Sequence, residues 1–213
     1  RKDGSVIWVE WHNSALRDAD GRLVSLLSLA QDVSSRIQAE ERLQFMATHD
    51  GLTGLPNRIM LTERLATAMA RAQRFGHRVA LMFLDLDHFK DVNDTLGHRV
   101  GDELLKSLAR RVRGALRQSD LLVRLSGDEF VVLLEDLEGD GGPDRVAQKI
   151  LEDVMRPFPI EGHDVQVSAS LGFAVYPEDG QDADTLLKNA DAAMYHAKEL
   201  GRNSYRAFSR SLA

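Results

Sequence analysis

Apolar residues recur along the chain with two different periods, and the change of period divides it into elements. Between Val6 and Trp11, apolar and polar positions alternate, which is typical of a strand with one buried face. A turn sequence at 18–21 (DADG) follows, and residues 22–33 predict a second strand. Two strands without a helix bury too little apolar surface to be stable alone, so we expect residues 1–33 to be part of a larger domain.

From residue 34 the pattern becomes that of a polar helix with a narrow apolar stripe. Ser35, followed three residues later by Gln38, predicts a capping box at the start of this helix. A narrow stripe indicates pairing with another helix rather than burial in a core. The stripe consists of Ile37, Leu43, Met46 and Ala47.

Helical and strand patterns alternate from residue 48 onward. Glu138–Pro143 (EGDGGP) is typical of a loop, and Gly76 predicts the end of a helix whose buried face carries Leu61, Leu65, Ala68, Ala72 and Phe75. This alternation, with one hairpin, predicts an α/β (α+β) fold in which helices flank a mixed central β-sheet. The expected helices are 57–75, 102–116, 144–155 and 185–200, and the expected strands are 79–84, 121–125, 130–134 and 165–177.

Composition excludes several classes of function. The chain has 213 residues, which is room for one full domain and part of another, and its net charge of −6 opposes general binding to nucleic acid or to an anionic membrane. There is no cysteine, so disulfides and thiolate metal sites are excluded. No apolar run approaches the roughly 20 residues of a membrane span, so we expect a cytoplasmic location and leave open a membrane tether in the parent protein.

Three carboxylates stand where strands are expected to end. Asp85 follows an apolar strand, and Asp128 and Glu129 lie in the turn Ser126–Glu129 between two apolar runs. Each alone is compatible with an ordinary solvated strand end or turn. If the strand lies beside the hairpin, the three form one cluster, and a hard cation such as Mg²⁺, which takes oxygen ligands and shares its shell with phosphate, would neutralise it. The seven histidines are scattered and do not have zinc-ligand spacing.

Two cations, Lys198 and Arg202, stand at the end of the last expected helix. Cations there ordinarily complement the helix dipole. The chain has no Walker A sequence, so any bound triphosphate would be held by a metal ion, loop amides and cations of this kind.

Several blocks of the sequence resemble, in the same order, those of GGDEF domains, the diguanylate cyclases. The resemblance covers about residues 48–208 and implies a fold of the nucleotide-cyclase or polymerase-palm kind. Residues 1–33 are similar to the last strands of a PAS sensor domain, and 34–47 to the signalling helix that joins it to a GGDEF domain at 48–213. The blocks are HDGLTGLPNR (49–58), FLDLDHFKDVNDTLGHRVGDELL (83–105), RLSGDEF (124–130), VSASLGFAVYP (167–177) and ADAAMYHAKELGRN (190–203).

The resemblance implies that two GTP molecules condense to cyclic di-GMP and two pyrophosphates. Each domain of a homodimer would hold one GTP, with the domains facing each other and the linker helices paired, and Mg²⁺ or Mn²⁺ would be the cofactor. The Mg²⁺ ligands would be Asp85, Asp128 and Glu129 with the Leu86 carbonyl, and Asp128 and Glu129 would also be catalytic. Asn93 and Asp102 would bind guanine, with His98 in the same pocket. Amides near Phe89 and Lys90, with Lys198 and Arg202, would hold the phosphates.

Arg117 and Asp120 form an RxxD sequence placed as in the family's inhibitory product site, although RxxD is most often a surface ion pair. The family usually has Gly where this chain has Ser126; if that position requires a positive φ, Ser costs about 1–2 kcal/mol. Two functions therefore stay open: an active cyclase regulated by a PAS sensor and by its product, or a module that binds GTP or cyclic di-GMP without catalysis. The tail 205–213 also resembles the lead into a further domain, of the EAL phosphodiesterase kind.

Overall fold

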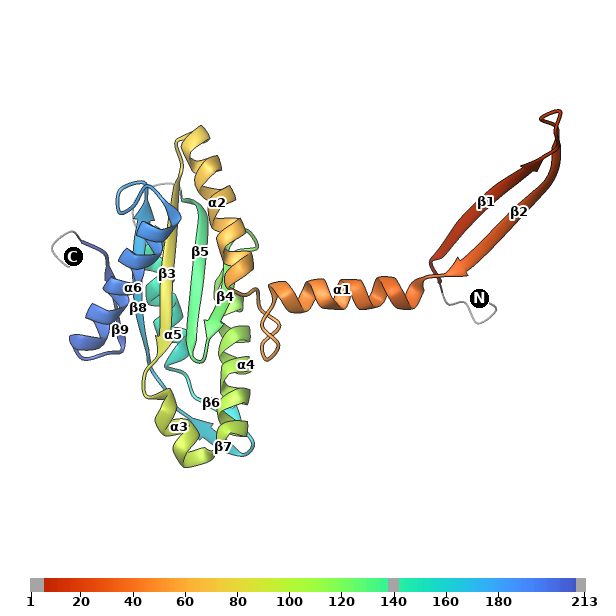
Figure 1. Ribbon diagram of the computed structural model, residues 1–213. Coiled ribbons are helices and arrows are strands. Elements are labelled where there is room, and N and C mark those ends of the chain that lie inside the picture. Colours follow the sequence, from red (N-terminus) through yellow and green to blue (C-terminus); the bar gives the residue numbers. More distant parts are fainter. Residues whose placement is uncertain (1–5, 138–141, 210–213) are drawn as a thin grey trace. The chain divides into compact units, whose positions relative to one another are not determined.

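The computed structural model describes residues 6–137 and 142–209, and the chain forms two compact units, Arg1–Ala47 and Thr48–Ala213. In the first unit, β1 (Val9–Arg17) pairs antiparallel with β2 (Leu23–Asp32), and α1 (Ser34–Thr48) follows (Figure 1). The expected turn at 18–21 is present, with Gly21 at φ 79°. The first strand starts and ends later than the alternating pattern of 6–11 predicted, because its pairing with β2 begins at Val9 and continues to Arg17.

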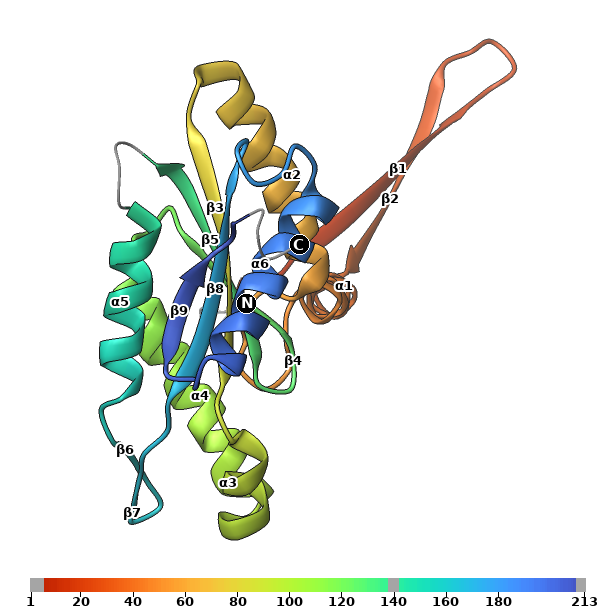
Figure 2. The ribbon, with the colours of Figure 1, turned by 90° about the vertical axis from the view of Figure 1, so that its left-hand side faces the viewer.

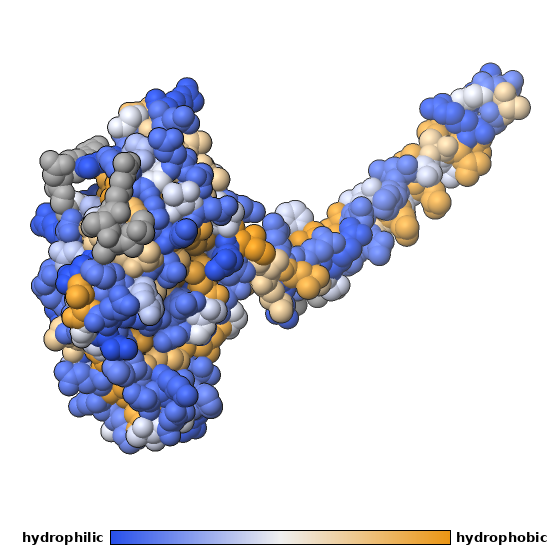
Figure 3. Space-filling model, turned by 60° about the vertical axis from the view of Figure 1, so that its left-hand side comes forward, coloured by the Kyte–Doolittle hydropathy of each residue, from blue (hydrophilic) through white to orange (hydrophobic). Residues whose placement is uncertain are grey.

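The two strands bury no core of their own, as expected. Trp11 is 63% exposed and Leu27 is 65% exposed, and Figure 3 shows apolar side chains in orange on the surface of the hairpin. The helix α1 likewise buries none of its residues, and Leu43 and Met46 of the apolar stripe are each 66% exposed.

The predicted capping box at the start of α1 is wrong. The helix begins at Ser34, so Ser35 lies inside its first turn. Ser34 makes the contacts there: its Oγ accepts a hydrogen bond from the Trp8 N–H at 2.9 Å, and its N–H donates to Asp32 at 3.0 Å.

The second unit is a five-stranded sheet in the order β4-β5-β3-β8-β9, with helices on both faces (Figures 1 and 2). All neighbouring strands are antiparallel except β8 and β9, which are parallel, so the predicted mixed sheet is confirmed. Its elements are α2 (Arg58–Phe75), β3 (Arg78–Leu86), α3 (Phe89–Leu96), α4 (His98–Ala115), β4 (Leu121–Ser126), β5 (Glu129–Leu137), α5 (Gly142–Val154), β6 (Phe158–Ile160), β7 (His163–Val165), β8 (Ala169–Tyr176), α6 (Ala183–Glu199) and β9 (Ser204–Ala207).

The strand β3 is buried on both faces of the sheet. Met82 and Leu84 belong to a core shared with α4 and α5, whereas Leu81 and Phe83 belong to a second core shared with α2 and α6. A strand covered on both sides reads as a continuous apolar run, which is why the sequence predicted it well.

The structure corrects several predicted bounds. Phe75 is 60% exposed, because α2 ends there and Gly76 turns the chain away at φ 70°. The fourth expected strand, 165–177, is divided between β7 and β8, and the second expected helix, 102–116, begins earlier, at His98. The short elements α3, β6 and β9 were not predicted, because a few residues carry too little periodicity.

Two further predictions concern loops. Residues 138–141 of the expected loop lie outside the described residues, and 142–143 belong to α5. The tail expected to lead into another domain begins inside this one, because residues 204–207 form the edge strand β9. Among the described residues, no helix combines the length and the apolar character that crossing a membrane requires.

Candidate nucleotide and metal site

The end of β3, which carries Asp85, lies beside the hairpin turn that carries Asp128 and Glu129. Asp85 lies opposite Glu129 of β5 and opposite Ser170 of β8 in the strand register. The expectation that this strand lies beside the hairpin is therefore confirmed, and the turn carrying Asp128 stands next to the end of β3.

A pocket of about 280 Å³ opens at this point. It brings together Asp85 and Asp128 with both cations, Lys198 and Arg202, although these residues come from three separate segments of the chain. Glu129 does not line it. The lining residues are Asp85, Leu86, Asp87, His88, Phe89, Lys90, Asp91, Asp128, Lys198 and Arg202.

The electrostatics of the pocket leave its carboxylates short of positive charge. Asp85 is only 7% exposed, and among the described residues its ionic partner is Lys198, whose Nζ lies 2.8 Å from Oδ2. Burial raises the pKa of Asp85, Lys198 opposes that rise, and the nearby charges of Asp128 and Glu129 add to it. Burial likewise raises the pKa of Asp128, with Glu129 adding to the rise and Lys198 opposing it. A bound cation would stabilise the charged form of both groups.

The donor set is suited to a hard cation. Carboxylate oxygens and the Leu86 carbonyl are ligands that Mg²⁺ accepts, and there is no thiol in the chain. Within 6–137 and 142–209, however, no three His, Cys, Asp or Glu side chains are already grouped at metal-binding distance. Asp85 directs one oxygen at Lys198, and Glu129 accepts a hydrogen bond from Ser126 Oγ at 3.0 Å.

The turn itself is held by an arginine that the sequence analysis did not single out. Arg124 donates from Nε and Nη2 to the Gly127 carbonyl, at 3.0 and 2.8 Å, and from Nη1 to Asp50 Oδ1 at 2.8 Å. Burial alone would raise the pKa of Asp50, but hydrogen bonds from Thr53 and Arg124 bring it below its ordinary value. Both residues lie in sequence blocks that resemble the GGDEF family, but the sequence did not predict that Asp50 and Arg124 pair with each other.

Ser126 does not incur the backbone strain considered from the sequence. The left-handed residue of the turn is Gly127, at φ 49°, and Ser126 is not among the residues with positive φ. Ser126 is the last residue of β4 and pairs with Glu129. Serine is therefore compatible with the backbone at this position.

The residues expected at guanine lie on α3 and α4 and do not line the pocket, although the first residues of α3 do. Asn93 is half-buried, and Asp102 and His98 are exposed. A side chain at Gly101 would bring its Cβ to 2.0 Å from Asn93 Oδ1, so this glycine leaves room for the amide between the two helices.

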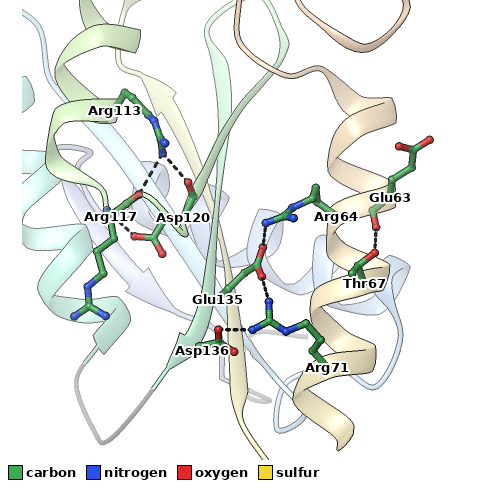
Figure 4. A network of polar contacts seen from close by, with 9 residues as sticks. All are labelled: Glu63, Arg64, Thr67, Arg71, Arg113, Arg117, Asp120, Glu135 and Asp136. Atoms are coloured by element: carbon green, nitrogen blue, oxygen red, sulfur yellow. Dashed lines mark hydrogen bonds and ion pairs between the residues drawn. The ribbon is translucent and has the colours of Figure 1, made fainter. Parts of the chain in front are cut away.

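The RxxD loop is arranged differently from an ion pair (Figure 4). Asp120, only 6% exposed, accepts a hydrogen bond from the backbone N–H of Arg117 at 2.9 Å. The Arg117 side chain is exposed and points away from it in Figure 4. Arg113 donates to the carbonyls of Asp120 and Arg117, at 2.6 and 3.3 Å, and so fixes the loop from the end of α4.

The mixed sheet, whose central strand ends in carboxylates beside a lysine and an arginine, is flanked by helices in a palm-like fold. Residues 47–204 match the family model described as "Diguanylate cyclase, GGDEF domain", and the chain belongs to the GGDEF family.

The chain is similar to curated and solved members of that family. It is 45% identical over 193 residues to the bifunctional diguanylate cyclase/cyclic di-GMP phosphodiesterase MucR of Pseudomonas aeruginosa, covering 91% of this chain and 28% of that one. The GGDEF domain of TpbB (YfiN) from the same organism superimposes with a TM-score of 0.74 at 42% identity, over 77% of this chain and 96% of that one.

A third neighbour was solved with a nucleotide. The coiled coil and GGDEF domain of DgcB from Caulobacter crescentus, in complex with c-di-GMP, matches with a TM-score of 0.71 at 30% identity, over 82% of this chain and 93% of that one. These neighbours confirm the predicted cyclase-like fold. The chain spans about a quarter of the length of the first curated relatives it matches, at 28%, 23% and 24%.

Proposed function

We propose that residues 48–213 form a diguanylate cyclase, which condenses two GTP molecules into cyclic di-GMP and releases two pyrophosphates. The observation that carries the proposal is the pocket at the end of β3, where Asp85 and Asp128 face Lys198 and Arg202. One buried carboxylate, Asp85, and one half-buried carboxylate, Asp128, both with raised pKa values, lie beside two cations and suit a metal–triphosphate better than any uncharged ligand.

In this proposal Asp85, Asp128, Glu129 and the Leu86 carbonyl hold Mg²⁺ or Mn²⁺, which supplies charge neutralisation at the phosphates. Lys198, Arg202 and the amides near Phe89 and Lys90 orient the triphosphate. Asn93 and Asp102, with His98 nearby, bind guanine.

Asp128 is the proposed base, because its carboxylate lines the pocket together with Asp85 and can accept a proton from a bound hydroxyl. It accepts the proton of a GTP 3′-hydroxyl. The 3′-oxygen then bonds to the α-phosphorus of the GTP held by the facing domain, and the bond from that phosphorus to the pyrophosphate oxygen breaks. Repetition of the step in the other direction closes the ring.

Because each domain holds one GTP, the reaction requires a homodimer. We propose that the exposed stripe of α1, including Leu43 and Met46, pairs with its copy in a parallel seam. Residues 1–33 would be the final strands of a PAS sensor, whose signal reaches the site through α1. The bridge from Asp50 through Arg124 to the Gly127 carbonyl offers a route, since Asp50 follows α1 closely in the chain.

We further propose product inhibition at Arg117, whose exposed guanidinium is available for a phosphate or a guanine face. Arg117→Ala should leave the initial rate unchanged and weaken inhibition by added cyclic di-GMP. Equal inhibition of both proteins would contradict this assignment.

A binding module without catalysis is the second candidate. The hydrogen bond from Ser126 to Glu129 favours it, because it engages an oxygen that metal binding would need. Incubating the protein with GTP and Mg²⁺ and separating the nucleotides distinguishes the two. The cyclase converts GTP and leaves ATP unchanged, whereas the binding module retains GTP and forms no product.

A further inference from the structure

The second carboxylate after β3, Asp87, is bound quite differently from Asp85. It is 4% exposed, and its side chain accepts three hydrogen bonds. Oδ2 accepts from Ser168 Oγ at 2.6 Å and from the Asn203 N–H at 3.0 Å, and Oδ1 accepts from Ser170 Oγ at 2.7 Å. The Asp87 N–H in turn donates to the Ser168 carbonyl at 2.9 Å. A carboxylate surrounded by donors in this way has little capacity left for a metal ion.

These hydrogen bonds tie together two segments that line the pocket. One is the loop from β3 into α3, and the other is the loop from α6 into β9. Non-glycine residues adopt left-handed backbone in both: His88 at φ 60°, Arg202 at φ 64° and Asn203 at φ 44°. Such conformations persist only where the surroundings hold them.

Hydrogen bonds of two successive backbone N–H groups hold the backbone at Arg202. Its own N–H donates to the Ala197 carbonyl at 3.1 Å, and the next N–H along the chain, that of Asn203, donates to Asp87. Without the carboxylate, the Asn203 N–H loses its acceptor. The contact of the Asn203 amide with Met155 Sδ and the pairing of Ser204 with Ser170 remain, but neither holds the backbone of Asn203 directly. The Arg202 side chain would then no longer be directed into the pocket.

We propose that Asp87 is a positioning residue for the triphosphate, acting through the backbone of Asn203 to place the Arg202 guanidinium. The inference rests on the proposed function, because it takes the pocket to be the phosphate site. It differs from a stability role in one measurable respect: the effect of Asp87 on GTP affinity depends on Arg202.

A double-mutant cycle tests this dependence. The probe is 3′-deoxy-GTP with Mg²⁺, which lacks the attacking hydroxyl, and its affinity is measured by calorimetry on Asp87→Ala, Arg202→Ala and the double variant. Each single change should weaken binding by about tenfold, and the double variant should bind no more than about threefold more weakly than either. Asp87→Asn should retain most of the affinity, because its carbonyl accepts from the Asn203 N–H while its amide donates to Ser170, whose hydroxyl can rotate.

The outcomes separate the two proposals. If the losses multiply to about a hundredfold, Asp87 does not act through Arg202 and the inference is overturned. If Asp87→Ala lowers the melting temperature but its folded fraction binds normally, the role is structural and the inference is again overturned. If the wild type does not bind the probe, the proposed function itself fails. Asp87→Ser, which keeps a polar group in the buried position, replaces Asp87→Ala in the cycle if the alanine variant does not fold. Asp94→Ala, at an exposed carboxylate on α3, is the matched control and should bind like the wild type.

Discussion

Asp85 and Asp120 are both buried acids at the ends of strands in one sheet, and burial raises the pKa of both. Their partners differ. Asp120 accepts hydrogen bonds from the backbone N–H groups of Arg117 and Glu135, whereas Asp85 has a lysine on one side and two other carboxylates on the other. The first therefore completes a loop, and the second lines a pocket that remains short of positive charge. A sequence motif alone does not separate these two uses of a carboxylate.

The largest expected effect is that of changing Asp85, the carboxylate that lines the pocket. Asp85→Asn should reduce the rate of cyclic di-GMP formation by more than about a hundredfold, because the amide cannot replace a charged ligand of the metal–triphosphate. The variant should fold normally. Product formation measured by chromatography, with a melting curve on the same sample, checks both statements. A rate within threefold of wild type would remove Asp85 from the site.

Asp120→Ala should lower the stability of the protein and leave the rate of the folded molecules nearly unchanged. The backbone N–H groups of Arg117 and Glu135 lose the buried carboxylate that accepts their hydrogen bonds, so the free energy of unfolding should fall by about 1–3 kcal/mol. The rate per folded molecule should stay within a few fold of wild type. Urea denaturation measures the loss, with Asp164→Ala, at an exposed carboxylate, as the control. A stable but inactive Asp120 variant would place this residue in the active site and contradict the difference in role between Asp85 and Asp120.

Asp50→Ala tests whether the turn depends on its arginine clamp. Without Asp50, Arg124 keeps its hydrogen bonds to the Gly127 carbonyl but loses its ionic anchor. We expect the turn to be placed less accurately and the rate to fall by about tenfold. Steady-state kinetics at saturating GTP measure the change, and an unchanged rate would show that the bridge is not needed for catalysis.

The pH dependence of the free energy of unfolding should also show that the ionised form of Asp85 destabilises the folded protein. Since the folded-state pKa of Asp85 is raised above 3.8, its ionisation disfavours the folded state, and this penalty is absent at low pH. The difference in unfolding free energy between Asp85→Asn and the wild type should therefore be constant below about pH 3, and Asp85→Asn should become relatively more stable as the pH rises to about 7. Denaturation of both proteins over a series of pH values gives the difference between their free energies of unfolding. The titration of the groups that both proteins share cancels in this difference. A difference that shrinks with rising pH would contradict the assigned sign.

The smallest expected effect is that of Ser126→Gly. Ser126 has ordinary backbone dihedrals, so the change relieves no strain and removes one hydrogen bond to Glu129. A single such bond is worth about 0.5–1.5 kcal/mol, so we expect the rate to change by less than about tenfold. A larger increase, measured under the same conditions, would show that the serine restrains Glu129 and would favour the binding-module function for the natural chain.

Much of the second unit could be predicted from its sequence, because long apolar runs such as that of β3 and regular helical stripes such as that of α2 carry strong periodicity. The convergence of Asp85 with the hairpin turn was also predicted. Contacts that depend on exact side-chain placement were not. Arg124 and Asp50 are 74 residues apart, and Asp87 and Asn203 are 116 apart, so no local pattern links them. The hydrogen bonds around Asp120 likewise follow from how the loop folds, not from the spacing of RxxD.

The proposal that the pocket is the active site of a diguanylate cyclase is tested most directly by the stoichiometry of the products that the wild type and Asp128→Asn form. With GTP and Mg²⁺, the wild type should release two pyrophosphates for each cyclic di-GMP, and Asp128→Asn should bind GTP but form essentially no product. The same product yield from both proteins would contradict the assignment of the pocket as the active site, and GTP bound but unconverted by the wild type would contradict the cyclase itself.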